Sequence, residues 1–186
     1  MVKLNKIYTR TGDAGETGLV DGSRASKADP RFAAIGDVDE ANTAIGVAMS
    51  AVENAPARAM LGRIQNELFD LGADLATPAG IEGAHRIQPE QVQRLEREID
   101  AMNQALEPLR SFILPGGEGG SAQLHFARAV VRRAERAAVA SASAFSPAAL
   151  TYLNRLSDHL FVLARWVARG EGGDILWRPG ATRGDG

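Results

Sequence analysis

Five long segments of this chain carry apolar residues at steps of three and four, and this spacing constrains the fold more than any other feature. Leu61, Ile64, Leu68, Leu71 and Leu75 show it most clearly. Such a period places an apolar stripe along one face of a helix, and no run shows the sustained alternation that is typical of strands. The spacing predicts helices over about residues 30–54, 56–76, 89–106, 121–141 and 147–169.

Helices of this length with short connections favour an antiparallel bundle. Pro89 suits a first helical turn, and Ser121 and Ser146 are predicted N-caps of the last two helices. We therefore expect one all-α domain, an antiparallel five-helix bundle over residues 30–169. An irregular Gly/Thr-rich loop over residues 1–28 precedes it, and a mobile tail over residues 170–186 follows it.

Composition excludes several kinds of chemistry. The 186 residues contain no cysteine, which excludes disulfides, thiolate metal sites and cysteine nucleophiles. The three histidines, His85, His125 and His159, form no HxxxH pair. A net charge of -2 argues against a general nucleic-acid or membrane-surface binder. The start of the chain does not resemble a secretory signal and no run is long enough to span a membrane, so we expect a cytoplasmic protein.

Residues 8–19 read Tyr-Thr-Arg-Thr-Gly-Asp-Ala-Gly-Glu-Thr-Gly-Leu. Glycines allow successive backbone N–H groups to face an anion, and the hydroxyls and the arginine add donors. The segment is a plausible polyphosphate cradle, although it lacks the GK[ST] step of a P-loop. From composition alone, a flexible terminal arm is the favoured alternative.

The fourth helix is expected to carry Arg128, Arg132 and Glu135 on one face at the edge of its apolar stripe, at about 100° per residue. An arginine at such an edge needs a partner or an anion, because burying it alone is costly. The alternative is a solvated face with an Arg132–Glu135 pair, worth only about 0.2–0.5 kcal/mol. The residues by themselves do not decide between the two.

Polar residues also interrupt the stripes of the first and fifth helices, at Asp39 and Asn42 and at Asn154 and Asp158. They either satisfy one another or line a cleft with the arginines. His125 and His159 are expected to be ordinary surface or interface residues. Phe112 and Phe161 are expected to be packing residues.

Several separated motifs resemble the PduO-type ATP:cob(I)alamin adenosyltransferases, in the expected order and over nearly the whole chain. They are the run 8–19, Ile35-Gly-Asp-Val-Asp-Glu-Ala-Asn42, Phe112-Ile-Leu-Pro-Gly-Gly117, Leu124-His-Phe-Ala-Arg128, Arg132-Arg-Ala-Glu-Arg136 and Tyr152-Leu-Asn-Arg-Leu-Ser-Asp158. Two positions depart from the family pattern. Ala41 stands where leucine is usual. Glu118-Gly119-Gly120 forms a variable loop, so the resemblance does not identify the residues at the edge of the corrin.

The resemblance implies a five-helix bundle that assembles as a homotrimer with active sites between subunits. Its substrates would be ATP with Mg²⁺ and a reduced corrinoid, cob(I)alamin, obtained from cob(II)alamin by an external reductase. The cobalt would attack the 5′-carbon of ATP, triphosphate would leave, and the product would be adenosylcobalamin. A further partner would be an acceptor enzyme that uses adenosylcobalamin.

The resemblance also implies residue roles. Asp39 would pair with Arg128 across the subunit boundary, Phe112 would press on the lower corrin face, and Phe161 would line the corrin pocket. No protein side chain is expected to hold a metal. The residues expected to bind ATP are Thr9, Arg10, Thr11, Gly12, Asp13, Gly15, Thr17, Lys27, Arg132, Arg133, Glu135, Arg136 and Asn154.

Two hypotheses of other classes stay open at this point. A non-catalytic carrier could use the same site to deliver a corrinoid or a nucleotide to a partner. A structural helical scaffold would not need its N-terminal arm at all.

Overall fold

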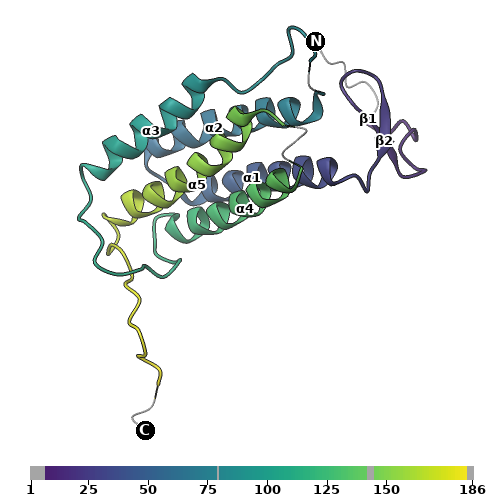
Figure 1. Ribbon diagram of the computed structural model, residues 1–186. Coiled ribbons are helices and arrows are strands. Elements are labelled where there is room, and N and C mark those ends of the chain that lie inside the picture. Colours follow the sequence, from purple (N-terminus) through teal and green to yellow (C-terminus); the bar gives the residue numbers. More distant parts are fainter. Residues whose placement is uncertain (1–6, 79, 142–144, 184–186) are drawn as a thin grey trace.

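A computed structural model of the protein describes residues 7–78, 80–141 and 145–183, and it confirms the five-helix fold. Each helix runs antiparallel to the next (Figure 1). The bounds lie within a few residues of those predicted. They are α1 Pro30–Ala51, α2 Ala55–Ala76, α3 Pro89–Asn103, α4 Ser121–Ala140 and α5 Pro147–Ala168.

The helices do not contact one another equally. α1 packs against α2 and α4, and α5 packs against α4 and α3. α3 is therefore the outermost helix and lies beside α5 (Figure 1). Because α3 and α5 both occupy odd places in an up-and-down order, they run parallel. The face between α4 and α5 carries no further helix.

A short hairpin is the only sheet in the described part of the chain. β1, Glu16–Gly18, pairs antiparallel with β2, Arg24–Ser26. The expectation of little or no strand is therefore met, with this hairpin as the small amount of strand. The hairpin stands beyond the end of the bundle at which α1 begins, whereas the C-terminal segment leaves from the opposite end (Figure 1).

The predicted caps are half right. The Ser146 side chain accepts a hydrogen bond from the Ala149 N–H at 3.1 Å, as expected for the N-cap of α5. The prediction for α4 is wrong, because its N-cap is Gly120, in the left-handed region at φ 88°. A Cβ there would lie 2.5 Å from Val52 Cγ2, so a close approach also requires the glycine. Ser121 instead donates to the Gly116 carbonyl.

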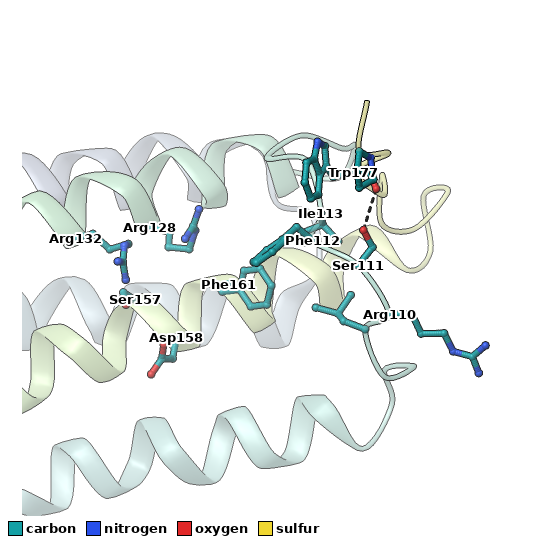
Figure 2. A pocket seen from close by; sticks show the side chains of 12 residues that line it. Arg110, Ser111, Phe112, Ile113, Arg128, Arg132, Ser157, Asp158, Phe161 and Trp177 are labelled. Atoms are coloured by element: carbon teal, nitrogen blue, oxygen red, sulfur yellow. Dashed lines mark hydrogen bonds between the residues drawn. The ribbon is translucent and has the colours of Figure 1, made fainter. Parts of the chain in front are cut away.

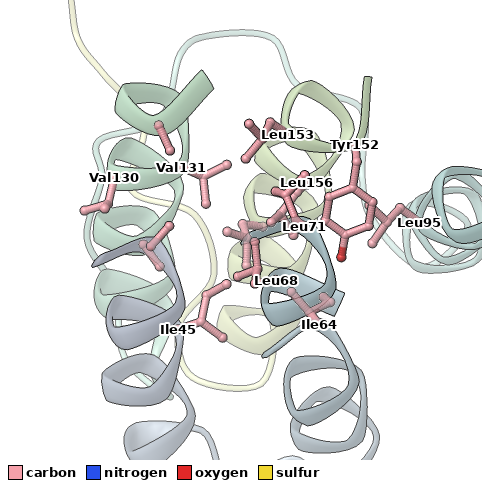
Figure 3. Close-up of a cluster of buried hydrophobic side chains, with 14 of the residues drawn as sticks. Ile45, Ile64, Leu68, Leu71, Leu95, Val130, Val131, Tyr152, Leu153 and Leu156 are labelled. Carbon is pink, nitrogen blue, oxygen red and sulfur yellow. The ribbon is translucent and has the colours of Figure 1, made fainter. Parts of the chain in front are cut away.

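The core lies along the bundle axis, where the predicted stripes meet (Figure 3). Ile45, Leu71 and Leu156 are completely buried in it. α4 contributes small side chains to this core, with Ala127 and Ala134 also completely buried. These alanines leave room for α1 on one side of α4 and α5 on the other.

Charged groups lie inside the bundle where α2, α3 and α5 meet. The Glu67 carboxylate, 4% exposed, accepts hydrogen bonds from the Tyr152 hydroxyl at 2.7 Å and from Arg94 at 2.9 Å. Beside it, Glu98 of α3 binds Arg63 of α2 and the His159 ring, whose Nε2 lies 2.8 Å from Glu98 Oε2. These contacts hold the outermost helix in place.

His125 and His159 were expected to be surface or interface residues. The surface alternative is wrong for both, because both are buried, and His159 lies at the contact between α3 and α5. His159 is buried by its partner Glu98 and the α3–α5 contact, and His125 by its place under Phe161. Neither partner is close in the sequence, so a single-helix pattern could not indicate the burial.

Glu98 makes part of the stability dependent on pH. Burial by itself would raise the pKa of Glu98, but hydrogen bonds from His159 and Arg63, together with their charges, lower it from 4.5 to about 2. A carboxyl whose pKa is lowered by folding stabilises the fold above its unfolded pKa, and this contribution is lost as pH falls towards the folded pKa. We predict that the free energy of unfolding of wild type falls more steeply between pH 4.5 and pH 2 than that of Glu98→Gln.

Urea denaturation at a series of pH values measures this difference. Glu53→Gln, at an exposed carboxyl, is the matched control and should follow the wild-type pH dependence. Equal slopes for wild type and Glu98→Gln over this range would contradict the assignment.

Candidate functional site

A cavity of about 760 Å³ opens on the face between α4 and α5 (Figure 2). α4 contributes Arg128 and Arg132, and α5 contributes Ser157, Asp158 and Phe161. The remaining walls come from outside the helices. They are Leu109, Arg110, Ser111, Phe112, Ile113, Trp177 and Pro179.

Two segments far apart in the sequence form the rim of this cavity, residues 111–114 and 174–177. An isolated β-bridge joins Ile113 to Leu176. The Trp177 N–H donates to the Phe112 carbonyl at 2.8 Å, and the Ser111 hydroxyl donates to the Trp177 carbonyl at 2.9 Å. The first half of the expected tail over residues 170–186 is therefore attached to the bundle and helps to build the site.

Aromatic side chains cover the rim end of the cavity. Phe112 is 78% exposed, and its ring meets that of Trp177 edge to face at 6.1 Å between centroids. Phe161 lies half-buried at the same end, whereas Arg110 points away (Figure 2). Exposed rings at a cavity mouth mark a surface for an apolar ligand. The expectation of a packing residue is confirmed for Phe161, which packs against the core and also lines this cavity, but it is wrong for Phe112, which is exposed at the rim.

The other end of the cavity is cationic. Arg128 and Arg132 point from α4 towards α5 (Figure 2), and neither side chain has an ion pair within the described residues. Arg128 lies over the Phe161 ring at 5.8 Å, and its buried Nε has no hydrogen-bond partner. Burial lowers the pKa of Arg128, and the charge of Arg132 lowers it further. An anion in the cavity would offset both effects.

His125 lies beneath this arrangement. Its ring meets Phe161 edge to face at 6.0 Å. Burial lowers the pKa of His125, and the charge of Arg128 adds to the effect. The neutral ring therefore supports Phe161 without adding a third positive charge under the cavity.

The structure brings together all but one of the other polar residues predicted for α4 and α5. Asn154 donates to Glu135 at 2.8 Å, and Arg136 donates to the Arg132 carbonyl at 3.0 Å. Arg133 instead forms ion pairs with Asp37 and Glu40 of α1. The Arg132–Glu135 pair considered as the alternative is absent from the ion pairs of the described residues.

The N-terminal arm, residues 7–28, is organised by its own hydrogen bonds. Lys27 donates to the Gly12 carbonyl at 2.9 Å, and Arg24 donates to the Thr11 carbonyl at 2.7 Å. The Thr9 and Thr11 hydroxyls lie 2.8 Å apart. Arg10 adopts a left-handed backbone at φ 62°, and Gly15 at φ 84°.

The remaining arm residues predicted for ATP lie in the same segment. Asp13 is exposed, and Thr17 lies in β1 opposite Ala25. For residues 9–27, the hydrogen bonds found in the described structure reach no residue of α2–α5. Within one chain, the structure does not bring the arm together with the rim, because they lie at opposite ends of the bundle (Figure 1).

Asp39 also lies away from the arginines. It lines a separate groove of about 430 Å³ between α1 and α2, together with Phe69 and Gly72. Asp39 does not pair with Asn42, which is buried and donates to the Gln65 carbonyl at 3.1 Å. A contact between Asp39 and Arg128 would therefore need a second copy of the chain.

The described residues contain neither a cluster of metal ligands nor a membrane-spanning helix. No group of three or more histidine and acidic residues there is placed to hold a metal ion. No helix there is long and apolar enough to cross a membrane.

Part of the cavity wall was not predicted from the sequence. Trp177 lies in a glycine-rich segment without a period, and Ser157 lies within the Tyr152–Asp158 motif but was given no role. An aromatic residue within a polar, glycine-rich end was the one available signal for Trp177.

Known proteins resemble this chain over most of its length. A family model described as cobalamin adenosyltransferase matches residues 7–167. A corrinoid adenosyltransferase of Mycobacterium tuberculosis is 51% identical, with 98% of this chain and 97% of that protein covered. One of Bacillus subtilis is 42% identical, with 95% and 94% covered.

A solved structure is similar as well. It is a variant of a PduO-type ATP:corrinoid adenosyltransferase from Lactobacillus reuteri, complexed with cobalamin and ATP. It has a TM-score of 0.86 and 38% identity, and the match covers 93% of this chain and 99% of that chain.

Arg128 and Arg132, which form no ion pair within the described residues, predict a measurable affinity of the cavity for anions. We expect Arg132→Ala to weaken the binding of inorganic triphosphate about tenfold, since one charge-assisted hydrogen bond contributes on the order of that factor. Isothermal titration calorimetry measures it. Arg97→Ala removes the same charge from an exposed position on α3 and should bind as wild type does. Equal losses in the two variants would indicate a general charge effect and no site.

Proposed function

Because the chain belongs to the cobalamin adenosyltransferase family, we propose that it transfers the 5′-deoxyadenosyl group of ATP to the cobalt of a reduced corrinoid. The reaction takes place in the cavity between α4 and α5. It gives adenosylcobalamin and triphosphate, so the protein is an alkyl-transferring enzyme.

One observation carries this proposal. A single cavity has exposed aromatic rings at one end and, at the other, two arginines that form no ion pair with any described residue. A corrinoid presents a broad apolar macrocycle, and ATP presents a polyanion, so the two ends match the two substrates.

The chemistry needs positioning more than acid–base groups. Cobalt(I) donates an electron pair to the 5′-carbon, the cobalt–carbon bond forms, and the bond from that carbon to the triphosphate oxygen breaks. The triphosphate leaves with the electrons of the broken bond. Arg128 and Arg132 stabilise the negative charge on the leaving group, and the walls hold the cobalt and the carbon in line. No cysteine or histidine nucleophile is required, since the nucleophile arrives with the substrate.

The aromatic rim acts on the corrinoid. Phe112 presses on the lower face and helps to remove the lower axial ligand, while Phe161 lines the pocket. Trp177 joins them, because its ring meets Phe112 and lines the same cavity. An apolar surrounding favours loss of the lower ligand and so makes cobalt(II) easier to reduce. An external reductase supplies that electron, in the cytoplasm.

ATP binds between two chains of a homotrimer. Lys27 and the Thr9–Thr17 segment of one chain wrap the phosphates, and residues of the α4–α5 face of its neighbour complete the site. The residues of that face that complete the site are Arg132, Glu135 and Asn154, with Arg136 nearby. Arg133 forms ion pairs with α1 instead. The separation of arm and cavity within one chain supports this arrangement (Figure 1). Mg²⁺ enters with ATP, since phosphate oxygens are ligands that it prefers.

The direct test mixes the protein with ATP, Mg²⁺ and chemically reduced cobalamin. We expect light-sensitive adenosylcobalamin and triphosphate in equal amounts over many turnovers, followed by absorbance and by phosphorus NMR. Arg132→Ala should retain its fold by circular dichroism and lose most of this activity. Absence of product from folded wild type would refute the proposal. Turnover that stops after one equivalent would favour a carrier that delivers adenosylcobalamin to an acceptor enzyme.

The trimer predicts a contact between Asp39 of one chain and Arg128 of the next. Removing one partner of a buried ion pair costs about 3–5 kcal/mol, so Asp39→Arg and Arg128→Asp should each dissociate the trimer. The double variant should restore it, because the two charges are exchanged. Analytical ultracentrifugation measures the assembly.

Glu53→Arg, a charge reversal at an exposed site, is the control for this series and should sediment as wild type does. A trimer that survives both single reversals would show that the two residues do not meet. A monomeric wild type would refute the assembly itself.

A further inference from the structure

Arg165, in the last turn of α5, contacts the start of one rim segment and the stretch of chain that leads to the other. It is only 7% exposed. Its Nε donates to Asp174 Oδ2 at 2.9 Å, and its Nη2 donates to the Glu107 carbonyl at 2.8 Å. Asp174 begins the segment that ends at Trp177, and Glu107 directly follows the turn after α3, in the stretch of chain that leads to Phe112.

The guanidinium suits this place for a physical reason. Its planar fork donates in two fixed directions, so one side chain can hold two separate backbones at a set distance. A buried cation needs such partners. The Asp174 carboxylate supplies the opposite charge, and the Glu107 carbonyl accepts a second hydrogen bond.

Two other hydrogen bonds attach the chain beside the rim, each to one segment only. The Gly173 N–H donates to the Ala168 carbonyl of α5 at 2.9 Å, and the Ser121 hydroxyl of α4 donates to the Gly116 carbonyl at 3.0 Å. The two segments bind each other through the Ile113–Leu176 bridge and the Trp177–Phe112 hydrogen bond. These bonds fix the segments relative to each other, whereas Arg165 fixes both relative to α5. α5 also carries Phe161, so Arg165 sets where Phe112 and Trp177 stand relative to it.

We propose that Arg165 and Asp174 are a positioning pair that holds the aromatic rim over α5 and thereby sets the affinity for the corrinoid. Neither residue lines the cavity between α4 and α5, and Asp174 lines a separate groove beside the same rim segment, so both act through the rim as positioning residues. The inference rests on the proposed function for the identity of the ligand. The mechanical part, an anchored rim, does not depend on the ligand.

The first experiment tests the anchor without any substrate. Trp166 and Trp177 are the two tryptophans of the chain, so Trp166→Phe leaves Trp177 as a single fluorescent reporter. In that background, Asp174→Asn should raise the acrylamide quenching constant of Trp177, because the released segment exposes the ring. Glu171→Gln is the matched control, a similar change at an exposed carboxyl three residues earlier, and should leave quenching unchanged. Equal quenching in all three proteins would overturn the anchor.

The second experiment separates positioning from general stability. Asp174→Asn should raise the KM for cobalamin about tenfold, a size expected for the loss of one charged hydrogen bond, while the KM for ATP stays at the wild-type value. Asp174→Glu keeps the charge and should recover part of the loss, and Arg165→Lys should fall between wild type and Asp174→Asn. The absorbance spectrum of cob(II)alamin bound to Asp174→Asn should show a smaller fraction of the corrinoid without its lower ligand than the spectrum of cob(II)alamin bound to wild type.

Each result decides one point. An unchanged KM for cobalamin, or equal rises in both KM values, would overturn the positioning role and leave only a structural one. Wild type that forms no adenosylcobalamin would refute the proposed function instead, and the quenching experiment would still decide on the anchor.

Discussion

Two arginines one helical turn apart, placed at the seam of α4 and α5 without an ion pair in the described chain, are the constraint on which the site depends. The alanine stripe of α4 brings α5 close, so Arg128 is partly buried over Phe161 and its Nε has no partner. Keeping Arg128 partly buried without an ion pair is locally unfavourable, whereas Arg132 is exposed to solvent. The unfavourable burial of this charge would be offset if an anionic leaving group and a carboxylate from a neighbouring chain occupy the seam during the reaction.

The arrangement of the bundle also supports the proposal that the site is shared between two chains. The arm with its threonines and Lys27 extends from one end, and the aromatic rim closes the other (Figure 1). Asp39 lies in the groove between α1 and α2, away from Arg128. In the proposed function each chain presents two separate halves of the ATP site, and assembly of identical chains would join them.

The sequence predicted the helices well, because the period of three and four reflects burial along each helix, as in Leu61–Leu75. It failed where the cause is tertiary. His159 and Glu67 look like surface residues in a helical pattern, yet Glu98 and Tyr152 from other helices make their burial favourable. Trp177 joins the cavity through a bridge to residues more than 60 positions earlier. For the site, the residues alone did not distinguish an anion-binding arginine face from a solvated one, or a phosphate cradle from a flexible arm. The family resemblance was the only basis for predicting an ATP site.

The central claim is that the cavity between α4 and α5 holds the corrinoid and the phosphates together. A crystal structure of the protein with ATP and cob(II)alamin tests it most directly. We predict the corrin ring against Phe112, Phe161 and Trp177, and the triphosphate on Arg132 under the Thr9–Thr17 segment of a neighbouring chain. A corrin bound outside this cavity, or phosphates held only by residues of one chain, would contradict the account.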